Sequence, residues 1–381
     1  MTDDATVWDV IVVGAGPAGS SAARTAAEAG ASVLLLDRAE FPRYKTCAGG
    51  LIGASLAHIP DSVRAVVEDE TLRATFMMRG RRPVTIERSA PFLAMVDRQR
   101  FDAAMLQAAM DAGAAFRGGV TVHVVREVAD AVEVETDSGV VRARTVIGAD
   151  GSASRIARHV GVRYRETDLG LEDEIAIDTT PWRGSVLIDF GRTPGSYAWL
   201  FPKQSTIAIG VIQRKGDPES TRAYLAEWRE RLGLTDAPAA HSTGHLTRWR
   251  EPDSPLRRGR VIVAGDAAGL LEPWLREGIS FALRSGSWAG EAASAAREDP
   301  ELLDAYADRV RRELATEQRA GALLLAAYER LPHVIHRALA GPAQSYFERY
   351  GRGETTLAKF WPRWSVRPLE WIARATRTHP F

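Results

Sequence analysis

The chain has 381 residues, 45% of them hydrophobic, which is enough for two domains or for one large domain with an embedded partner. Basic and acidic residues balance at 49 each, so no long-range field favours nucleic acid or an anionic membrane. A single cysteine excludes an intrachain disulfide, and the absence of asparagine excludes N-glycosylation, which together fit a cytoplasmic protein.

The first predicted element is a strand at Val7–Val13, followed by the sequence GAGPAG and an alanine-rich helix. Gly14 permits a tight turn, Gly16 allows a pyrophosphate to approach the backbone, and Gly19 allows the helix to pack on the strand. The helix N-terminus around Ala18 offers free N–H groups and positive partial charge. This pattern predicts a bound dinucleotide.

A second strand, Ser32–Leu36, ends at an acidic residue and an arginine, Asp37 and Arg38. A carboxylate at this position can accept hydrogen bonds from ribose hydroxyls, which favours an unphosphorylated adenosine ribose over that of NADP. We therefore expect both residues at the adenosine end of the ligand.

The next segment, FPRYKTCAGGL at residues 41–51, carries the only cysteine and one of only four lysines, in a chain with 45 arginines. A lysine in a chain so rich in arginine suggests a task that needs the compact ammonium of lysine rather than the planar guanidinium of arginine. Lys45 and Cys47 are therefore the candidate catalytic residues. The alternative for Cys47 is a small buried filler.

Two later strands also end in acid-and-glycine turns. Asp150 follows a strand that ends near Gly148, and Asp266 follows the strand Arg260–Ala264, where it can bond a polyol hydroxyl. A helix beginning at Gly278 and Ile279 could stabilise negative charge on a reduced flavin. Three such turns in order favour FAD over NAD.

Between these parts the pattern alternates, as at Val186–Phe190 and Ile207–Ile212, which predicts antiparallel strands. The fold class is α/β with mixed α+β character: a Rossmann-like domain with a parallel sheet, an inserted antiparallel β-sheet domain and C-terminal helices. We expect residues 1–70, 96–163 and 255–295 to bind the dinucleotide, 71–95 and 164–254 to form the substrate domain, and 296–381 the helical region.

Tyr197, Trp199 and Phe201 should share one face of a strand, because side chains alternate along it. With Trp274, they are the candidate lining of an apolar substrate channel. The alternative is ordinary sheet core.

Six sequence motifs carry a family resemblance. GAGPAG, Ala149-Asp150-Gly151 and GDAAG resemble the FAD-dependent hydroxylase-like superfamily, and FPRYKTCAGGL narrows this to the geranylgeranyl reductase-like group. The sequence GSYAWLFPK at 195–203 is similar to that group's GYxWxFPK signature, and DRQRFD at 97–102 to its RxxFD element. The resemblance implies FAD contacts from Gly19, Asp37, Cys47, Ala48, Gly50, Arg98, Val122, Asp266, Gly278 and Ile279.

Two residues depart from the group's pattern. Glu272 stands where many members have Asn or Asp, and Arg276 is a bulky residue beside Glu277. These two side chains could pair with each other, reshape the pocket or meet an acidic group of the substrate. The departures put the identity of the substrate in doubt more than the binding of flavin.

The resemblance implies an FAD-dependent oxidoreductase that reduces C=C bonds of a polyprenyl-type substrate. The alternatives are a monooxygenase acting on an aromatic or polyketide-like substrate, with a halogenase less favoured, and a non-catalytic FAD-binding protein. The sequence contains no metal-binding motif. It also contains no second GxGxxG after a strand, so no separate nicotinamide-binding domain is expected, and electrons would come from transiently bound NAD(P)H or from a reductase protein.

The N-terminus lacks the features of a signal peptide, and no apolar run approaches the roughly 20 residues that span a bilayer. Near the C-terminus, Trp361, Trp364 and Trp371 alternate with basic residues, which fits a peripheral membrane contact. The alternative is a helical cap. We expect a hydrophobic small-molecule substrate, an electron-donor protein as a further candidate partner, and no nucleic acid.

Overall fold

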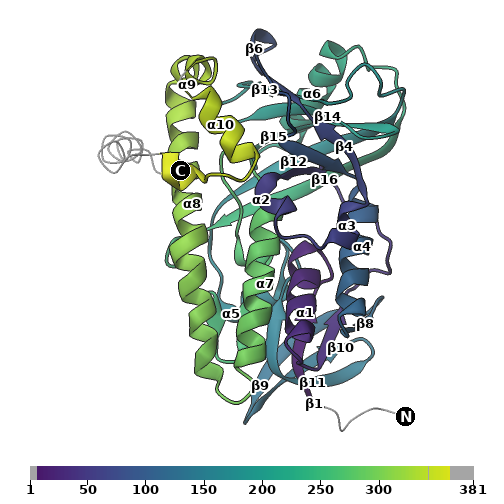
Figure 1. Cartoon of the computed structure of the whole chain (residues 1–381), viewed down its shortest axis with the longest axis vertical. Helices are drawn as coiled ribbons and strands as arrows, with labels where there is room; N and C mark the ends of the chain where they lie inside the picture. The colour runs from purple at the N-terminus through teal and green to yellow at the C-terminus, as the bar shows by residue number, and fades with distance from the viewer. Residues whose placement is uncertain (1–6, 342, 361–381) are drawn as a thin grey trace.

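The computed structural model describes residues 7–341 and 343–360. Figure 1 shows two regions along the long axis, with the first strand at the lower end and a second sheet at the upper end. Helix α8 (Asp304–Arg330) runs along one side of both regions. The mixed α/β class with a separate antiparallel sheet and C-terminal helices is as the sequence predicts.

The lower region is built on an eight-stranded sheet. Its main path runs β17-β18-β11-β1-β2-β8, and β10 and β9 continue from β11. β1 pairs in parallel with both β2 and β11, and β11 pairs in parallel with β18. The strands are β1 (Val7–Val13), β2 (Val33–Leu36), β8 (Ala115–Arg117), β9 (Val122–Val128), β10 (Ala131–Thr136), β11 (Gly139–Gly148), β17 (Arg257–Arg258) and β18 (Val261–Val263).

Both faces of the parallel strands are buried, which is why β1 and β2 read as continuous apolar runs. Two helices, α1 (Pro17–Glu28) and α7 (Ile279–Ala295), cover one face and cross closely. A Cβ at Gly286 would lie 2.1 Å from the carbonyl oxygen of Ala18, and a Cβ at Gly290 would lie 2.3 Å from that of Ala22. Glycine at these positions therefore lets α7 pack directly on α1.

The upper region contains a seven-stranded sheet in the order β16-β12-β15-β14-β13-β5-β6. All neighbours are antiparallel except β13 and β5, which pair in parallel. A third sheet has three strands in the order β3-β7-β4, and these strands occur in the chain between β2 and β8 of the lower sheet. The strands are β3 (Gly50–Ile52), β4 (Val67–Thr71), β5 (Arg73–Met78), β6 (Arg81–Glu87), β7 (Leu93–Val96), β12 (Tyr164–Ala176), β13 (Ser185–Phe190), β14 (Tyr197–Pro202), β15 (Thr206–Arg214) and β16 (Ala239–Arg250).

The remaining helices surround these sheets. They are α2 (Gly53–Leu56), α3 (Asp61–Arg64), α4 (Arg98–Asp111), α5 (Arg155–Val160), α6 (Pro218–Arg231), α9 (Pro332–Leu339), α10 (Gln344–Gly351) and α11 (Leu357–Phe360), with 3₁₀ turns at Gly265–Ala268 and Pro300–Leu303. An aromatic core joins the seven-stranded sheet to the C-terminal helices, and the rings of Phe190 and Tyr328 lie 4.8 Å apart within it.

No helix within the described ranges is long and apolar enough to cross a membrane. The tryptophans proposed for a peripheral contact, Trp361, Trp364 and Trp371, lie outside the described residues.

Candidate flavin and substrate site

The glycine-rich turn joins β1 to α1. Gly14 has a φ of 101°, and a Cβ there would lie 2.3 Å from the carbonyl oxygen of Ala149, so the turn packs directly on the second motif. Gly16 caps α1 without a side-chain hydrogen bond. Around Gly16 the space is open, since the nearest atom to an added Cβ is Nη2 of Arg43 at 3.7 Å. The helix N-terminus is therefore free to receive an anion.

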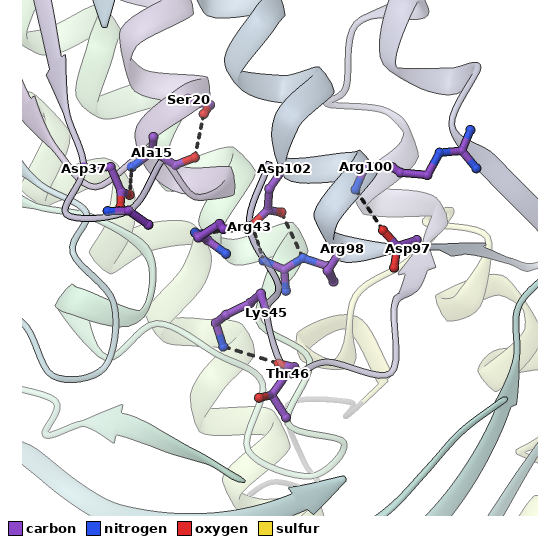
Figure 2. Close-up of polar contacts among 11 residues, drawn as sticks. Ala15, Ser20, Asp37, Arg43, Lys45, Thr46, Asp97, Arg98, Arg100 and Asp102 are labelled. Atoms are coloured by element: carbon purple, nitrogen blue, oxygen red, sulfur yellow. Dashed lines mark hydrogen bonds and ion pairs between the residues drawn. The ribbon is translucent and has the colours of Figure 1, made fainter. Parts of the chain in front are cut away.

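Asp37 fixes the shape of this turn. Its Oδ2 accepts the Ala15 N–H at 2.7 Å, and its Oδ1 accepts the Ala39 N–H at 2.9 Å (Figure 2). Each carboxylate oxygen retains a lone pair for a ribose hydroxyl. Arg38, predicted beside it, is exposed at this edge.

Arg98 begins α4 and is buried. Its Nε and Nη2 each lie 2.9 Å from an oxygen of Asp102, which forms a bidentate fork, and Nη2 of Arg43 lies 3.1 Å from the same carboxylate (Figure 2). The Nη1 of Arg43 is buried and has no hydrogen-bond partner among the described residues. Sequence reasoning placed Arg98 here by resemblance but gave no role to Asp102.

Lys45 is a half-buried cation near these groups. Its Nζ donates to the carbonyl of Thr46 at 3.3 Å (Figure 2). Burial, followed by the nearby charge of Arg98, lowers the pKa of Lys45, and Asp266 and Cys47 act in the opposite direction. A buried ammonium with so little compensation favours a negatively charged ligand group beside it.

Cys47 is tied to the upper sheet by its main chain. Its N–H donates to Oε1 of Glu172 on β12 at 3.0 Å, and Oε2 of Glu172 is buried without a partner among the residues described. Burial raises the pKa of Glu172 to about 7. Beside it, Nζ of Lys203 pairs with Glu174 at 3.0 Å, with both side chains buried. The sequence analysis did not predict a role for Glu172 or Glu174. Their spacing of two residues along a predicted strand, which places both on one face, was the available signal.

Close backbone contacts surround the glycine pair after Ala48. A Cβ at Gly49 would lie 2.1 Å from the carbonyl oxygen of Val96, and a Cβ at Gly50 would lie 3.0 Å from Cε2 of Phe201. The cysteine segment therefore passes between β7 and the aromatic strand β14. The structure brings FPRYKTCAGGL and YAWLFPK together, although they are 150 residues apart in the chain.

Asp266 lies in the 3₁₀ turn before α7. A Cβ at Gly278 would lie 3.4 Å from its Oδ1, and Nε2 of His245 lies 3.7 Å from its Oδ2. Burial alone would raise the pKa of Asp266, but His245, Lys45 and Arg98 together lower it. The carboxylate and the helix beginning at Ile279 therefore adjoin the cation cluster, as expected of groups facing one ligand.

Asp150 and Val122 lie at the other end of this region. Asp150 accepts hydrogen bonds from the Ser154 hydroxyl and, at 2.7 Å, from the Arg155 N–H, so it anchors the start of α5. The carbonyl of Val122 accepts Nη1 of Arg155 at 2.7 Å. Both groups already have intramolecular partners, and their contacts with a ligand stay predictions.

The aromatic residues share one face, as the alternation predicts. Tyr197, Trp199 and Trp274 are buried in one cluster and Phe201 packs against it. The indole N–H groups of Trp199 and Trp274 are buried and have no partner among the described residues. The cluster includes core contacts with the C-terminal helices, so its role as a substrate channel stays a prediction.

The two departures from the family pattern do not pair with each other as one interpretation allowed. Glu272 accepts the N–H groups of Trp274 and Leu275, each at 2.6 Å. Arg276 instead forms a buried ion pair with Asp168 on β12, at 3.1 Å, and its guanidinium lies over the ring of Tyr197. Arg276 has a positive φ of 54°. The side chains of Glu272 and Arg276 therefore bind different partners.

The groups present fit a flavin dinucleotide. The open space at Gly16, the orphaned Nη1 of Arg43 and the poorly compensated Lys45 together form a cradle for a pyrophosphate. Asp37 lies at the glycine turn and Asp266 near Lys45 and Arg98, and their contacts with ligand hydroxyl groups stay predictions. No cluster of three or more metal-ligating side chains occurs in the part of the chain that the structure describes.

Comparisons with known proteins agree with this geometry. Residues 7–320 match a family model described as FAD binding domain. Digeranylgeranylglycerophospholipid reductase 1 of Methanopyrus kandleri is 33% identical over 79% of this chain and 85% of its own. Geranylgeranyl diphosphate reductase of Rhodobacter capsulatus is 32% identical over 76% of this chain and 75% of its own. Menaquinone reductase of Mycobacterium tuberculosis is 31% identical over 83% and 84%.

Among solved structures, a geranylgeranyl bacteriochlorophyll reductase-like protein of Thermoplasma acidophilum has a TM-score of 0.74 at 21% identity, covering 98% of this chain and 96% of its own. A flavin-dependent brominase has a TM-score of 0.76 at 18% identity, covering 97% and 100%. These likenesses show the fold.

Proposed function

Because the chain belongs to the geranylgeranyl reductase-like group of FAD-dependent oxidoreductases, we propose that it reduces carbon–carbon double bonds of a hydrophobic, isoprenoid-type substrate. The observation that most supports this proposal is the contact of Gly50 with Phe201, which joins the cysteine segment to the aromatic face of β14. An apolar chain lying against that face would be next to the flavin-proximal segment.

Bound FAD would supply the hydride, itself obtained from NAD(P)H or from a reductase protein. The glycine turn, Asp37, Arg43 and Lys45 would hold the cofactor through its phosphates and ribose. The N-terminus of α7 and Asp266 would orient the ring end. We assign cofactor binding to residues 1–70, 96–163 and 255–295, and substrate binding to residues 71–95 and 164–254.

Reduction of a double bond also requires a proton. The N–H of Cys47 donates to the carboxyl group of Glu172, and because the pKa of Glu172 is raised to about 7, this group is partly protonated near neutral pH. We propose that Cys47 faces the substrate and that Glu172 keeps its segment in place.

An anaerobic experiment tests the reaction. The FAD-loaded protein is photoreduced and mixed with a geranylgeranyl lipid, and reoxidation is followed at the flavin absorbance band. We expect reoxidation without oxygen and a product heavier by two hydrogens. No reoxidation under these conditions, together with hydroxylation once oxygen is admitted, would show a monooxygenase. No reaction in either condition would favour a non-catalytic FAD-binding protein.

The variant Cys47→Ser tests the role of the thiol. We expect it to retain FAD and to slow reoxidation by the lipid. Unchanged turnover would show that Cys47 only fills space. Ser55→Ala is a suitable control, since its buried hydroxyl has no partner among the described residues and Ser55 is not one of the candidate contact residues.

A further inference from the structure

A second cavity lies apart from the glycine turn, at the far end of the seven-stranded sheet. Its volume is about 450 Å³, and three junctions line it: the β5–β6 turn, the β13–β14 turn and the start of α9. Figure 1 shows β6 and α9 at the upper end of the molecule, opposite β1. The cavity lies largely in the ranges proposed above for substrate binding, but none of the flavin-site residues described above lines it.

The lining is strongly cationic. Arg79, Arg81 and Arg82 contribute three guanidinium groups and His333 an imidazole, against a single carboxylate, Glu329. Within the described ranges, Arg81 makes no ion pair and no side-chain hydrogen bond, so one guanidinium is free to bind. Surplus positive charge around a concave surface attracts anions.

Tyr328, a residue with a buried hydroxyl group, also lines the cavity. Tyr328 is only 2% exposed, and its hydroxyl has no hydrogen-bond partner among the residues described. Burial raises the pKa of this phenol, so the hydroxyl stays protonated and can donate, and the charge of Arg79 acts on it from nearby. A buried donor without an acceptor costs free energy unless a ligand satisfies it.

The backbone of the β5–β6 turn is strained in a way that places these arginines. Arg79 and Arg82 each have a φ of 53°, a left-handed conformation that residues with a side chain seldom adopt. Nε of Arg79 donates to the carbonyl of Gly191 at 2.6 Å, and Nη1 of Arg82 lies 3.3 Å from Nδ1 of His333. The sheet and the C-terminal helices thus hold two of the guanidinium groups from opposite sides.

We propose that this cavity binds a phosphate or diphosphate group. The planar guanidinium fork matches the geometry of phosphate oxygens, and the unpartnered phenol of Tyr328 supplies a further donor. Met78, Pro194 and Pro332 give the cavity apolar walls, which suit an ester carried on a hydrocarbon stem. The proposal does not depend on the reaction at the flavin site.

Calorimetric titration of the FAD-loaded full chain tests this proposal with two probes, inorganic pyrophosphate and dodecyl phosphate. We expect Arg81→Gln to weaken binding of both probes about tenfold, since it removes a charge-assisted hydrogen bond to the phosphate oxygens. Tyr328→Phe should weaken binding severalfold without lowering the thermal midpoint, because it removes a buried hydroxyl that has no partner among the described residues. Flavin absorbance checks that FAD stays bound in each variant.

The matched control is Arg183→Gln, an exposed arginine of the same sheet region that does not line the cavity. Tighter binding of dodecyl phosphate than of pyrophosphate would identify an amphiphile headgroup as the ligand, and the reverse a free anion. The proposal is overturned if neither probe binds, if Arg81→Gln and Tyr328→Phe bind as the unmodified chain does, or if Arg183→Gln weakens binding equally.

Discussion

The main-chain N–H of Cys47 donates to the carboxylate of Glu172 at 3.0 Å, which fixes the segment holding the only cysteine to strand β12 of the other sheet. Glu172 is 1% exposed, and this contact, with Lys203 nearby, is part of what opposes the cost of burying it. The segment around Cys47 and the seven-stranded sheet are therefore joined through a titratable group.

This burial predicts a dependence of stability on pH. The pKa of Glu172 is raised to about 7 in the folded chain from an ordinary 4.5, so the native state binds more protons between these values and stability falls as pH rises through them. Removing the charge with Glu172→Gln should reduce that fall by on the order of 2–3 kcal/mol. Urea unfolding at pH 5 and pH 8 measures it.

Glu272 has a similarly raised pKa of about 7, so some pH dependence should remain in Glu172→Gln. Glu230→Gln, an exposed site on α6, is the control and should leave the profile unchanged. An identical profile in Glu172→Gln and the unmodified chain would contradict the prediction.

Gly16 and Gly14 should respond differently to alanine. In Gly16→Ala the added Cβ would have only Nη2 of Arg43 nearby, at 3.7 Å. The free energy of unfolding should therefore change by less than about 0.5 kcal/mol. The added methyl would occupy the space for a pyrophosphate, and FAD affinity should fall at least tenfold. Gly14→Ala should instead destabilise the fold, because its φ is 101° and its Cβ would clash with Ala149.

Fluorescence titration of apoprotein with FAD, together with urea unfolding, separates these effects. Gly216→Ala is the matched control, since its nearest contact would be 3.9 Å away. If Gly16→Ala bound FAD as tightly as the unmodified chain, the cradle would have been placed wrongly.

Breaking the fork between Arg98 and Asp102 should be costly. Arg98→Met leaves the fully buried Asp102 with Arg43 as its remaining cation, at 3.1 Å, and should lower the free energy of unfolding by about 3 kcal/mol. Arg98→Met with Asp102→Leu should recover part of this loss, because the buried carboxylate is removed together with its partner; the recovery is partial because Arg43 then loses its ion pair.

Arg100 lies on the same helix and pairs with Glu68, but it is exposed, so Arg100→Met should cost less than about 1 kcal/mol. Equal losses in Arg98→Met and Arg100→Met, measured by urea unfolding, would contradict this prediction.

Lys45→Met should stabilise the apoprotein while weakening its cofactor binding. Burial lowers the pKa of Lys45, so holding the ammonium charged costs the folded state free energy below the ordinary pKa of 10.5, and this cost falls as pH rises toward that value. At pH 7 we expect a higher free energy of unfolding for the apoprotein and a loss of FAD affinity of about tenfold.

Thermal unfolding and FAD titration provide the measurements, with the exposed Lys215→Met as control. A destabilised apoprotein with normal FAD affinity would show that Lys45 has a structural role.

Short-range sequence patterns predicted several elements of this structure. The strand at Val7–Val13, the turn at Gly14 and the carboxylate at Asp37 follow from short-range rules, because each depends on residues a few positions away. The period-two spacing of Tyr197 and Trp199 likewise placed them on one face.

The amino-acid sequence by itself determined the fold class, the family and the chemistry of the glycine turn. Only the tertiary structure decided that Glu172 holds the Cys47 segment, that Arg276 pairs with Asp168 rather than with Glu272, and that arginines surround a second cavity. The physical reason is that burial and long-range pairing set the energy of a charge, and neither is encoded in the spacing of neighbouring residues.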